Sequence, residues 1–319
     1  MNFLVTGGAG FIGSHVCEQL LHEGHAVWTL DDLNPSYSPA VKRENLAALS
    51  AHGRAFTFVE GDLTDPGTVE GLLARTRFDQ IIHLAARAGV RPSLEQPALY
   101  QRVNVEGTVN VFEAARRHGV QKVTLASSSS VYGVNAKVPF SETDPIFAPI
   151  SPYAASKLAC EALAHVYHHV HGLDVAALRF FTVYGPRQRP DLAIHKFASL
   201  ITAGRPIPVF GEGTSARDYT FITDTVAGIL ACTRRTFGYQ VFNLGESQTV
   251  TLNRLIALLE QGLGRKAVID RQPLQPGDVP ITYADITKAR AQLGYQPRVP
   301  IEEGLPRFLE WFRRRPVGA

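Results

Sequence analysis

The fold of this chain is decided by Thr6-Gly7-Gly8-Ala9-Gly10-Phe11-Ile12-Gly13. This stretch follows an apolar strand pattern at Phe3–Thr6 and opens a helical pattern at Ile12–Glu23. Glycines at these spacings permit a tight turn and let backbone N–H groups approach a pyrophosphate. The helix N-terminus adds unpaired donors and the positive end of its dipole. We therefore expect the pyrophosphate of a dinucleotide to bind at Gly7, Gly10, Phe11, Ile12 and Gly13.

An acidic pair ends the second strand pattern. Asp31 and Asp32 follow the apolar run Ala26–Leu30, at the distance expected for a carboxylate that hydrogen-bonds the adenosine ribose. A carboxylate there repels a 2′-phosphate, and no arginine follows immediately to receive one. These features predict NAD as the cofactor. Further cofactor contacts are expected after the third and fourth strands, at Asp62, Leu63, Leu84, Ala85 and Ala86.

Short apolar runs and helical patterns alternate through the first half of the chain. The remaining strands are expected at Phe56–Val59, Gln80–Leu84, Val123–Ala126 and Val175–Phe181, and the helices at Thr68–Arg75, Ala98–His118 and Pro152–His171. Continuous apolar strands separated by helices are typical of a parallel sheet covered on both faces. The sequence therefore predicts an α/β fold with a doubly wound parallel sheet of the Rossmann type.

The pattern changes after Phe181, where prolines divide the chain into short pieces. A helix at Asp224–Thr233 and a strand at Gln240–Leu244 still look like parts of the large sheet domain. We predict an NAD-binding domain at residues 1–181, to which the chain returns at about 218–245. Residues 182–217 and 246–319 are predicted to form a smaller α/β domain that binds the substrate, ending in an amphipathic helix at Glu302–Arg313.

Composition excludes several classes of protein. The chain has a net charge of +3 and 19% charged residues, without the concentrated basic stripe of a nucleic-acid-binding protein. Its three cysteines are far apart and show no CxxC spacing, which argues against disulfides and a zinc site. The N-terminus runs directly into the glycine loop, and no apolar stretch approaches the ~18 residues of a membrane span. We expect a cytoplasmic protein without a metal, membrane or nucleic-acid partner.

Tyr153 and Lys157 form a candidate catalytic pair. They lie four residues apart in Ser-Pro-Tyr-Ala-Ala-Ser-Lys (151–157), so they share one face of a helix. A tyrosine hydroxyl is a weak acid at neutral pH, and a nearby ammonium group stabilises its deprotonated form. The run Ser127–Ser130 precedes this helix, at the end of the fifth strand. The pattern indicates proton-transfer chemistry.

In this order and at this spacing, the glycine loop, Asp31, Ser128, Tyr153 and Lys157 resemble the extended short-chain dehydrogenase/reductase family over essentially the whole chain. The stretches Ser-Ser-Val-Tyr-Gly (129–133) and Arg-Phe-Phe-Thr-Val-Tyr-Gly-Pro (179–186) are similar to those of NDP-sugar 4-epimerases. The resemblance implies that Tyr153 removes the proton of the sugar 4-OH while hydride leaves C4 for NAD. It also implies that Ser128 hydrogen-bonds the same oxygen and that Lys157 holds the nicotinamide ribose. Asn104 matches a cofactor-side position.

The resemblance also distinguishes between reactions. Related 4,6-dehydratases carry an Asp-Glu pair beside the catalytic serine or threonine, and uronate decarboxylases carry a Glu there. This chain has Ser129 and Ser130, and neither can act as the carboxyl acid–base that water elimination needs. Dehydration is therefore disfavoured.

Several positions resemble UDP-glucuronate 4-epimerases in particular. They are Thr182, where hexose epimerases commonly carry Asn, the run 185–191 and the run 275–280. A C5 carboxylate needs a guanidinium and hydroxyl donors, which we expect from Arg189, Thr182 and Ser129. The resemblance further implies that Phe210 contacts uracil, Arg217 the diphosphate and Asp278 the uridine ribose, and that Arg91 reaches the substrate pocket.

The sequence leaves alternatives open. The sugar could be UDP-glucose or UDP-N-acetylglucosamine, and the chain could be a dehydrogenase or reductase that releases its cofactor, or a non-catalytic nucleotide sensor. Family members usually dimerise through two helices, here Ala98–Ala115 and Leu158–Val170, so the resemblance implies a homodimer. Burial of the same residues against the sheet is the alternative.

Overall fold

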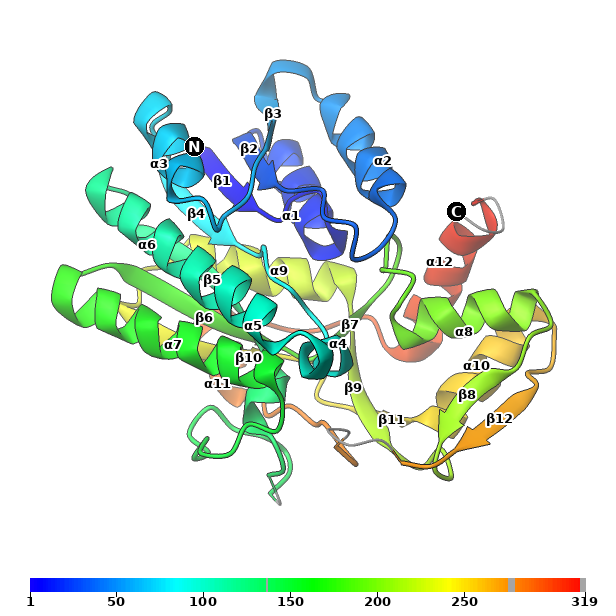
Figure 1. The fold of residues 1–319 in the computed structure, drawn as a ribbon. Coiled ribbons are helices and arrows are strands. Elements are labelled where there is room, and N and C mark those ends of the chain that lie inside the picture. Colours follow the sequence, from blue (N-terminus) through cyan, green and yellow to red (C-terminus); the bar gives the residue numbers. More distant parts are fainter. Residues whose placement is uncertain (136, 275–278, 316–319) are drawn as a thin grey trace.

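The computed structural model describes residues 1–135, 137–274 and 279–315. Within them the largest sheet has seven parallel strands in the order β10-β6-β5-β4-β1-β2-β3 (Figure 1). The strands are β1 (Asn2–Thr6), β2 (Ala26–Asp31), β3 (Phe56–Glu60), β4 (Gln80–His83), β5 (Lys122–Ser128), β6 (Asp174–Phe180) and β10 (Tyr239–Leu244). The order reverses between β1 and β4, which is where ligands bind in sheets of this kind. The predicted doubly wound α/β fold is confirmed.

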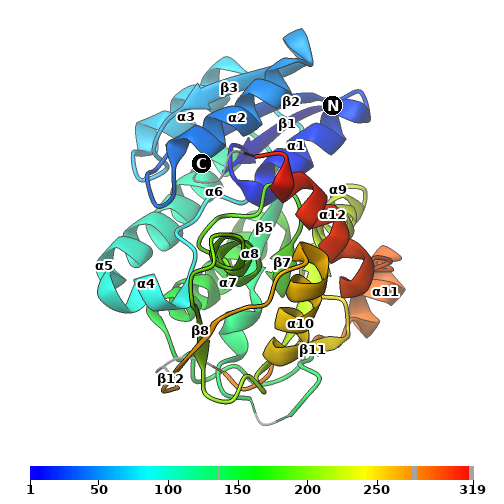
Figure 2. The same ribbon diagram turned by 90° about the vertical axis from the view of Figure 1, so that its right-hand side faces the viewer.

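Smaller elements gather at one end of the large sheet, and Figure 2 looks onto that end. Three strands, β7 (Thr182–Tyr184), β9 (Ala216–Phe221) and β11 (Thr249–Thr251), form a second sheet, and β8 (Ile207–Phe210) pairs with β12 (Ile269–Gln272). The accompanying helices are α8 (Ala193–Thr202), α10 (Leu252–Leu263) and α12 (Ile301–Arg313), whereas α11 (Thr287–Leu293) packs against β10 and α9 (Ile222–Thr233). Strand β10 of the large sheet lies between β9 and β11 in the chain, so the polypeptide crosses between the two regions.

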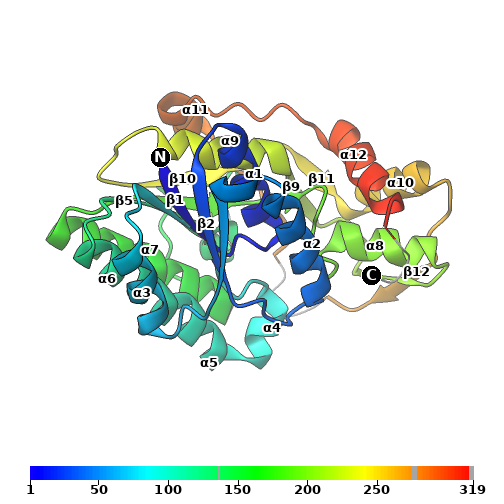
Figure 3. The same ribbon diagram turned by 90° about the horizontal axis from the view of Figure 1, so that it is seen from above.

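Helices cover both faces of the large sheet (Figure 3). One face carries α1 (Phe11–His22), α2 (Pro39–Ser50) and α9 (Ile222–Thr233), and the other carries α3 (Pro66–Arg75), α6 (Gly107–Arg117) and α7 (Pro152–His171). Leu4 and Val5 are neighbours on β1, and both are fully buried, but they belong to separate apolar clusters. Successive side chains of a strand point to opposite faces, so the continuous apolar runs correspond to strands buried on both sides.

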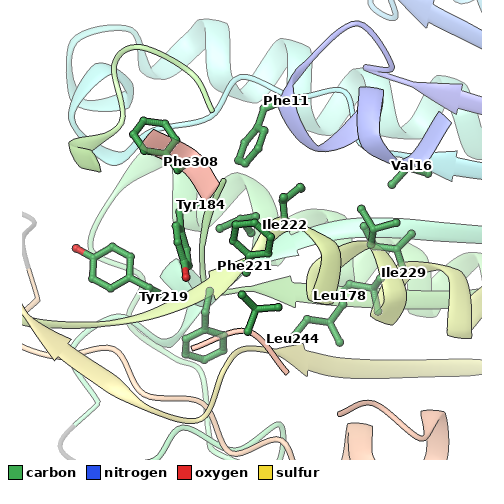
Figure 4. Packing of buried hydrophobic residues seen from close by; sticks show 14 of the residues in the cluster. Phe11, Val16, Leu178, Tyr184, Tyr219, Phe221, Ile222, Ile229, Leu244 and Phe308 are labelled. Carbon is green, nitrogen blue, oxygen red and sulfur yellow. The ribbon is translucent and has the colours of Figure 1, made fainter. Parts of the chain in front are cut away.

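The cluster on the α1 face continues into the smaller region (Figure 4). Phe11 of α1, Ile222 at the start of α9 and Phe308 of α12 belong to this one cluster. Tyr184 at the end of β7 is fully buried in it, with its ring edge-on to Phe221 at 5.4 Å between centroids. The two regions therefore share a continuous core, which fixes the β7 and β9 residues relative to the large sheet.

Several helices differ from the sequence-based expectation, since α2, α4 (Val90–Glu95), α8, α10 and α11 were not predicted and one expected helix is divided. Helix α2 was not expected, because only a few of its residues, such as Val41, Leu46 and Leu49, are apolar and buried. The single helix expected at Ala98–His118 consists of α5 (Pro97–Tyr100), a π-helical turn (Gln101–Glu106) and α6. Such π turns shift the side chains that follow them and often occur at functional sites. Within the described parts of the chain, no helix is long and apolar enough to cross a bilayer.

Candidate active site

The glycine loop is packed too tightly for side chains. Gly7 has a φ of +74°, and a Cβ there would lie 2.8 Å from the backbone of Ala85. A Cβ on Gly13 would lie 2.2 Å from the carbonyl oxygen of Gly7. Helix α1 begins after Gly10 with no side-chain cap and no acidic residue in its first turn. The start of this helix therefore fits a pyrophosphate, which would accept hydrogen bonds from its free N–H groups.

Asp31 lies buried at the end of β2, where a ribose-binding carboxylate was predicted. Its Oδ1 accepts hydrogen bonds from Leu33 N (2.9 Å) and Lys42 Nζ (3.0 Å), and its Oδ2 accepts one from Ala9 N (3.3 Å). Lys42 also lies 3.8 Å from Asp32 Oδ1. The charge of Lys42 is thus neutralised by two carboxylates instead of facing a 2′-phosphate, which fits NAD. The sequence reasoning missed Lys42 because it lies on the unexpected helix α2.

The other predicted cofactor residues follow β3 and β4 at the edge of the sheet that also carries the glycine loop. Leu63 is buried, Asp62 is exposed, and Leu84, Ala85 and Ala86 follow β4 directly. Ala85 N donates to Thr6 Oγ1 (3.2 Å), which ties this loop to the end of β1. These positions surround one edge of the sheet, as a cofactor site requires.

Asn104 is 1% exposed and lies in the π-helical turn. Its Oδ1 accepts from Arg87 N (2.7 Å), and its Nδ2 donates to Arg87 O (3.0 Å) and to Ser156 Oγ (2.9 Å). Its amide therefore connects the loop after β4 with α7. A direct contact between Asn104 and the cofactor stays a prediction.

His83, the last residue of β4, stabilises the same region through two hydrogen bonds. Its Nδ1 lies 2.6 Å from Thr6 Oγ1 and its Nε2 lies 3.0 Å from Thr108 Oγ1. Burial, followed by the charge of Lys157, lowers the pKa of His83 to about 3, so the ring is neutral. Thr108 Oγ1 in turn donates to Asn104 O (2.5 Å). A chain of hydrogen bonds thus connects β1 to the π-helical turn.

Helix α7, which carries Tyr153 and Lys157 in its N-terminal half, packs on β5, which ends at Ser128 (Figure 1). Lys157 is 5% exposed, and its Nζ donates to the carbonyl of Ala126 (2.8 Å), two residues before Ser128 on β5. Tyr153 is half-buried in the first turn of α7, and its ring lies edge-on to that of Tyr100 at 6.1 Å. Ser128 Oγ accepts from Ser130 N (3.2 Å) and so caps the short 3₁₀ turn Ser129–Tyr132.

A cavity of about 190 Å³ lies beside this junction. Its lining residues are Val90, Ser129, Ser130, Gly133, Phe140, Ile150, Ser151, Thr182, Arg217, Val279 and Thr282. Three of the predicted substrate contacts, Ser129, Thr182 and Arg217, are therefore brought together. Ser130, Ser151 and Thr282 add hydroxyl groups that sequence reasoning did not assign, and the described lining contains no carboxylate. The cavity offers hydroxyl donors and one guanidinium to a ligand.

Arg189 is not among the residues that line this cavity. Its Nε and Nη2 donate to the two carboxylate oxygens of Asp191 at 3.0 and 2.5 Å, and its guanidinium lies 5.8 Å from the ring centroid of Tyr37. Holding a substrate carboxylate would require Arg189 to exchange Asp191 for the substrate. Of the three residues predicted to hold the substrate carboxylate, Ser129 and Thr182 therefore line the cavity, whereas Arg189 lies outside it.

Arg91 and Phe210 also lie outside the lining, but next to each other. Arg91 belongs to α4 (Val90–Glu95) and Phe210 to the end of β8, and the guanidinium lies 4.2 Å from the ring centroid. Asp278, the residue predicted at the uridine ribose, is outside the described residues.

In residues 1–135, 137–274 and 279–315, no group of three or more His, Cys, Asp or Glu side chains is arranged to hold a metal ion. The rings of His165 and His169 stack on the outside of α7 at 6.2 Å. Cys17, Cys160 and Cys232 are buried free thiols. No metal centre is found in this part of the chain.

Comparison with known proteins places this geometry in a family. The model of the family described as GDP-mannose 4,6 dehydratase matches residues 4–308. The UDP-glucuronate 4-epimerase of Thermodesulfobacterium geofontis is 42% identical over 310 residues, covering 97% of this chain and 95% of the relative. The chain belongs to this family of extended short-chain dehydrogenases/reductases, whose members include NAD-dependent enzymes acting on nucleotide sugars.

Two solved structures extend the comparison. The UDP-glucuronic acid 4-epimerase of Bacillus cereus, in complex with UDP-glucuronic acid and NAD, superposes with a TM-score of 0.92 at 34% identity. The UDP-glucose 4-epimerase of Thermotoga maritima, with UDP-glucose, gives 0.91 at 35% identity. Each alignment covers 98% of this chain and 99% of the other. The backbone is equally similar to both, so the choice of sugar depends on the residues of the cavity.

Proposed function

We propose that this chain is an NAD-dependent UDP-glucuronate 4-epimerase, which interconverts UDP-glucuronate and UDP-galacturonate. The observation that carries the proposal is the cavity lined by Ser129 and Ser151, whose described lining is rich in hydroxyl groups and contains Arg217 but no carboxylate. Hydroxyl donors suit a substrate carboxylate, whereas a lining carboxylate would repel it. The named relatives and the complex with UDP-glucuronic acid support the same substrate.

The residues that line the cavity also argue against dehydration of the sugar. Elimination of water needs a positioned acid and base, usually carboxyl groups, on the substrate side of the cofactor. Ser129 and Ser130 occupy the turn where related dehydratases carry carboxyl groups, and both line the cavity. A serine hydroxyl cannot exchange protons efficiently near neutral pH, so the chemistry available is oxidation and reduction at one carbon.

The residues at the junction of α7 and β5 can perform such a reaction. Bound NAD would accept a hydride from C4 of the sugar and later return it. Tyr153 takes the proton of the 4-OH as the carbonyl forms and gives it back at the end. Ser128 hydrogen-bonds the same oxygen, and Lys157 stabilises the phenolate of Tyr153 and holds the nicotinamide ribose. The Ala126 carbonyl fixes Lys157 for this task.

Inversion requires the 4-keto sugar to rotate before it is reduced. The 4-keto uronate is a β-keto acid, so it can also lose CO₂ during this time. We propose that Ser129, Thr182 and Arg189 hold the C5 carboxylate out of alignment with the carbonyl, with Arg189 leaving Asp191 when substrate binds. Arg217 and Arg91 are proposed to bind the diphosphate side of the substrate, Phe210 the uracil and Asp278 the uridine ribose.

The cofactor is proposed to lie along the edge formed by the glycine loop, Asp31 and the segments after β3 and β4. Residues 1–181 and about 218–245 would form the NAD-binding domain, and residues 182–217 and 246–319 the smaller substrate domain.

The test of the proposed function has two parts. The purified protein is denatured and the released NAD is quantified, and the native protein is incubated with UDP-glucuronate without added cofactor. Retained NAD and a UDP-galacturonate product are expected, whereas formation of one NADH per substrate consumed, from added NAD, would favour a cofactor-releasing dehydrogenase.

We also propose a homodimer formed by α6 and α7. Val166 and Val170 on the outer face of α7 are 49% and 61% exposed, although both are apolar. A shallow groove on the π-helical turn and the start of α6 is lined by Gln101, Arg102, Val105, Glu106 and Val109. Two copies of such a face can pack about a two-fold axis. Sedimentation should give the mass of a dimer, and Val166→Glu should shift it toward the monomer.

A further inference from the structure

A buried ion pair lies next to the junction of α7 and β5, one helical turn beyond Lys157. Glu161 of α7 and Arg179 of β6 are 3% and 4% exposed. Arg179 Nε donates to Glu161 Oε1 (2.9 Å), and its Nη2 donates to Glu161 Oε2 (2.7 Å). Two buried charges are costly unless their remaining hydrogen bonds are made. The partners that make those bonds are therefore informative.

The remaining bonds lead to the turn that carries the cavity serines. Ser127 Oγ donates to Glu161 Oε1 (2.5 Å). Arg179 Nη1 donates to Tyr132 Oη (3.0 Å), and the guanidinium lies 4.8 Å from the centroid of the Tyr132 ring. Ser127 and Tyr132 lie on either side of Ser128, Ser129 and Ser130. The ion pair thus holds both ends of the segment that supplies the catalytic serine and two serines of the cavity lining.

The same helix face carries the proposed proton-transfer residues. Tyr153, Lys157 and Glu161 follow one another at intervals of four, so they form one row along α7. Consecutive residues of β5 meet this row, since Ala126 O accepts from Lys157 and Ser127 Oγ donates to Glu161. Two adjacent contacts therefore set the position of the serine turn, residues 128–130, relative to Tyr153. Only the first of them, made by Lys157, involves a proposed catalytic residue.

A second branch reaches the cavity wall. Tyr132 Oη donates to Asn243 Oδ1 (2.7 Å), and Asn243 Nδ2 donates to Phe140 O (2.9 Å). Phe140 lines the cavity. One connected set of buried polar groups thus supports two sides of the space in which the sugar would rotate. Such fully bonded networks are rigid, and loss of one member loosens the groups that depend on it.

We infer that Glu161 and Arg179 are positioning residues that determine whether the 4-keto uronate is reduced or decarboxylated. The inference rests on the proposed function. Loss of CO₂ breaks the C5–C6 bond and leaves its electron pair as the enolate of the C4 ketone, which then takes up a proton at C5. This step needs the breaking bond to stand perpendicular to the carbonyl plane. A serine turn that is free to move would let the carboxylate reach that orientation.

The test measures the ratio of UDP-4-keto-pentose to UDP-galacturonate formed from UDP-glucuronate, together with kcat and KM. Arg179→Lys keeps the positive charge but loses the bidentate hydrogen bonds to Glu161. Ser127→Ala and Tyr132→Phe each remove one hydroxyl group and leave the ion pair intact. We expect each variant that folds to raise the ratio by about tenfold, because small displacements in an active site have large effects on rate. KM should change less than kcat.

A matched control lies at the other end of the same two strands. Lys122 at the start of β5 pairs with Asp174 at the start of β6 at 2.5 Å, with side chains 11% and 10% exposed. Lys122→Met should lower the unfolding temperature and leave the product ratio unchanged. If Ser127→Ala and Tyr132→Phe fold and give the wild-type ratio, or if Lys122→Met raises it equally, the inference is wrong. Epimerisation by the wild-type protein tests the proposed function separately.

Discussion

The guanidinium of Arg91 lies 4.2 Å from the centre of the Phe210 ring and so joins two parts of the molecule that are 119 positions apart in sequence. Arg91 follows β4 of the large sheet, whereas Phe210 ends β8 in the smaller region. Contacts of this kind are worth about 0.5–2 kcal/mol, depending on how far they are desolvated. Phe210 is proposed to contact the uracil and Arg91 to reach the substrate pocket, so on this account the pair would link substrate binding to the junction of the two regions.

Phe210→Ala should therefore raise KM for UDP-glucuronate by about tenfold, since the loss of one aromatic contact costs roughly 1–2 kcal/mol. The value of kcat should change little, because Phe210 is remote from the proposed reacting carbon. Initial rates over a range of substrate concentration measure both quantities. Phe147→Ala is the control, since Phe147 is 88% exposed and lines no described cavity. An unchanged KM in Phe210→Ala would remove Phe210 from the uracil site.

Tyr153→Phe should reduce kcat by about 10²–10⁴-fold, the usual contribution of a positioned acid–base group. Binding of UDP should be unchanged, because the ring and its contact with Tyr100 are preserved. Isothermal titration with UDP and a rate assay measure the two effects. Tyr100→Phe serves as the control, since it removes only a hydrogen bond to Ala88 O (3.1 Å). Comparable losses in both variants would argue against Tyr153 as the proton-transfer residue.

Asp31→Ala should reduce the fraction of protein that retains NAD by about tenfold or more, because it removes the acceptor proposed for the adenosine ribose and leaves Lys42 buried with fewer partners. The NAD released after denaturation, per mole of protein, measures the effect. Asp62→Ala should retain more NAD, since Asp62 is exposed and accepts only from Thr64 N in the described structure. Full NAD retention in Asp31→Ala would place the adenosine ribose elsewhere.

Glu246 should make stability depend on pH. It is 9% exposed, its Oε2 has no hydrogen-bond partner among the described residues, and burial together with Asp224 and Asp218 raises its pKa to about 8. The nearby Arg290 opposes this shift only weakly. Because the folded chain binds the proton more tightly than the unfolded chain, the stability from this group is complete below about pH 4.5 and is lost as the pH rises through 8.

Glu246→Gln, which stays neutral, should therefore unfold at a temperature several degrees above wild type near pH 9. Asp218, whose burial raises its pKa to about 6, titrates in a lower range, so measurements above pH 6.5 isolate Glu246. The advantage should shrink as the pH falls. Thermal melts of both proteins between pH 6.5 and 9 test this, with the exposed Glu303→Gln as control. A difference between the two melts that does not vary with pH would contradict the assignment.

Local patterns were sufficient to predict the large sheet. Continuous apolar runs such as Gln80–Leu84 correspond to buried strands, and the glycine loop and Asp31 lie where their spacing indicated, because each is determined by residues close in sequence. Lys42 was missed because its role depends on a helix with few apolar residues. It becomes recognisable only when α2 folds back over the end of β2.

Long-range partners were the harder part of the site. The stacking of Arg91 on Phe210 depends on how α4 and β8 are placed relative to each other by the common core, which no local pattern encodes. The same is true of the bond from Ser127 to Glu161, which joins a strand to a helix 34 positions later. Sequence identified the residue types for the site but not which of them meet.

The most direct test of the central claim is to compare kcat/KM for UDP-glucuronate, UDP-glucose and UDP-N-acetylglucosamine with one preparation and no added NAD, resolving all products by chromatography. The account predicts a UDP-galacturonate peak, little UDP-pentose, and kcat/KM for UDP-glucuronate at least about 100-fold above that of the neutral sugars, since a neutral sugar cannot form the charge-assisted hydrogen bonds proposed for the carboxylate. Preferred conversion of a neutral sugar would contradict the assignment of Ser129, Thr182 and Arg189 to a carboxylate.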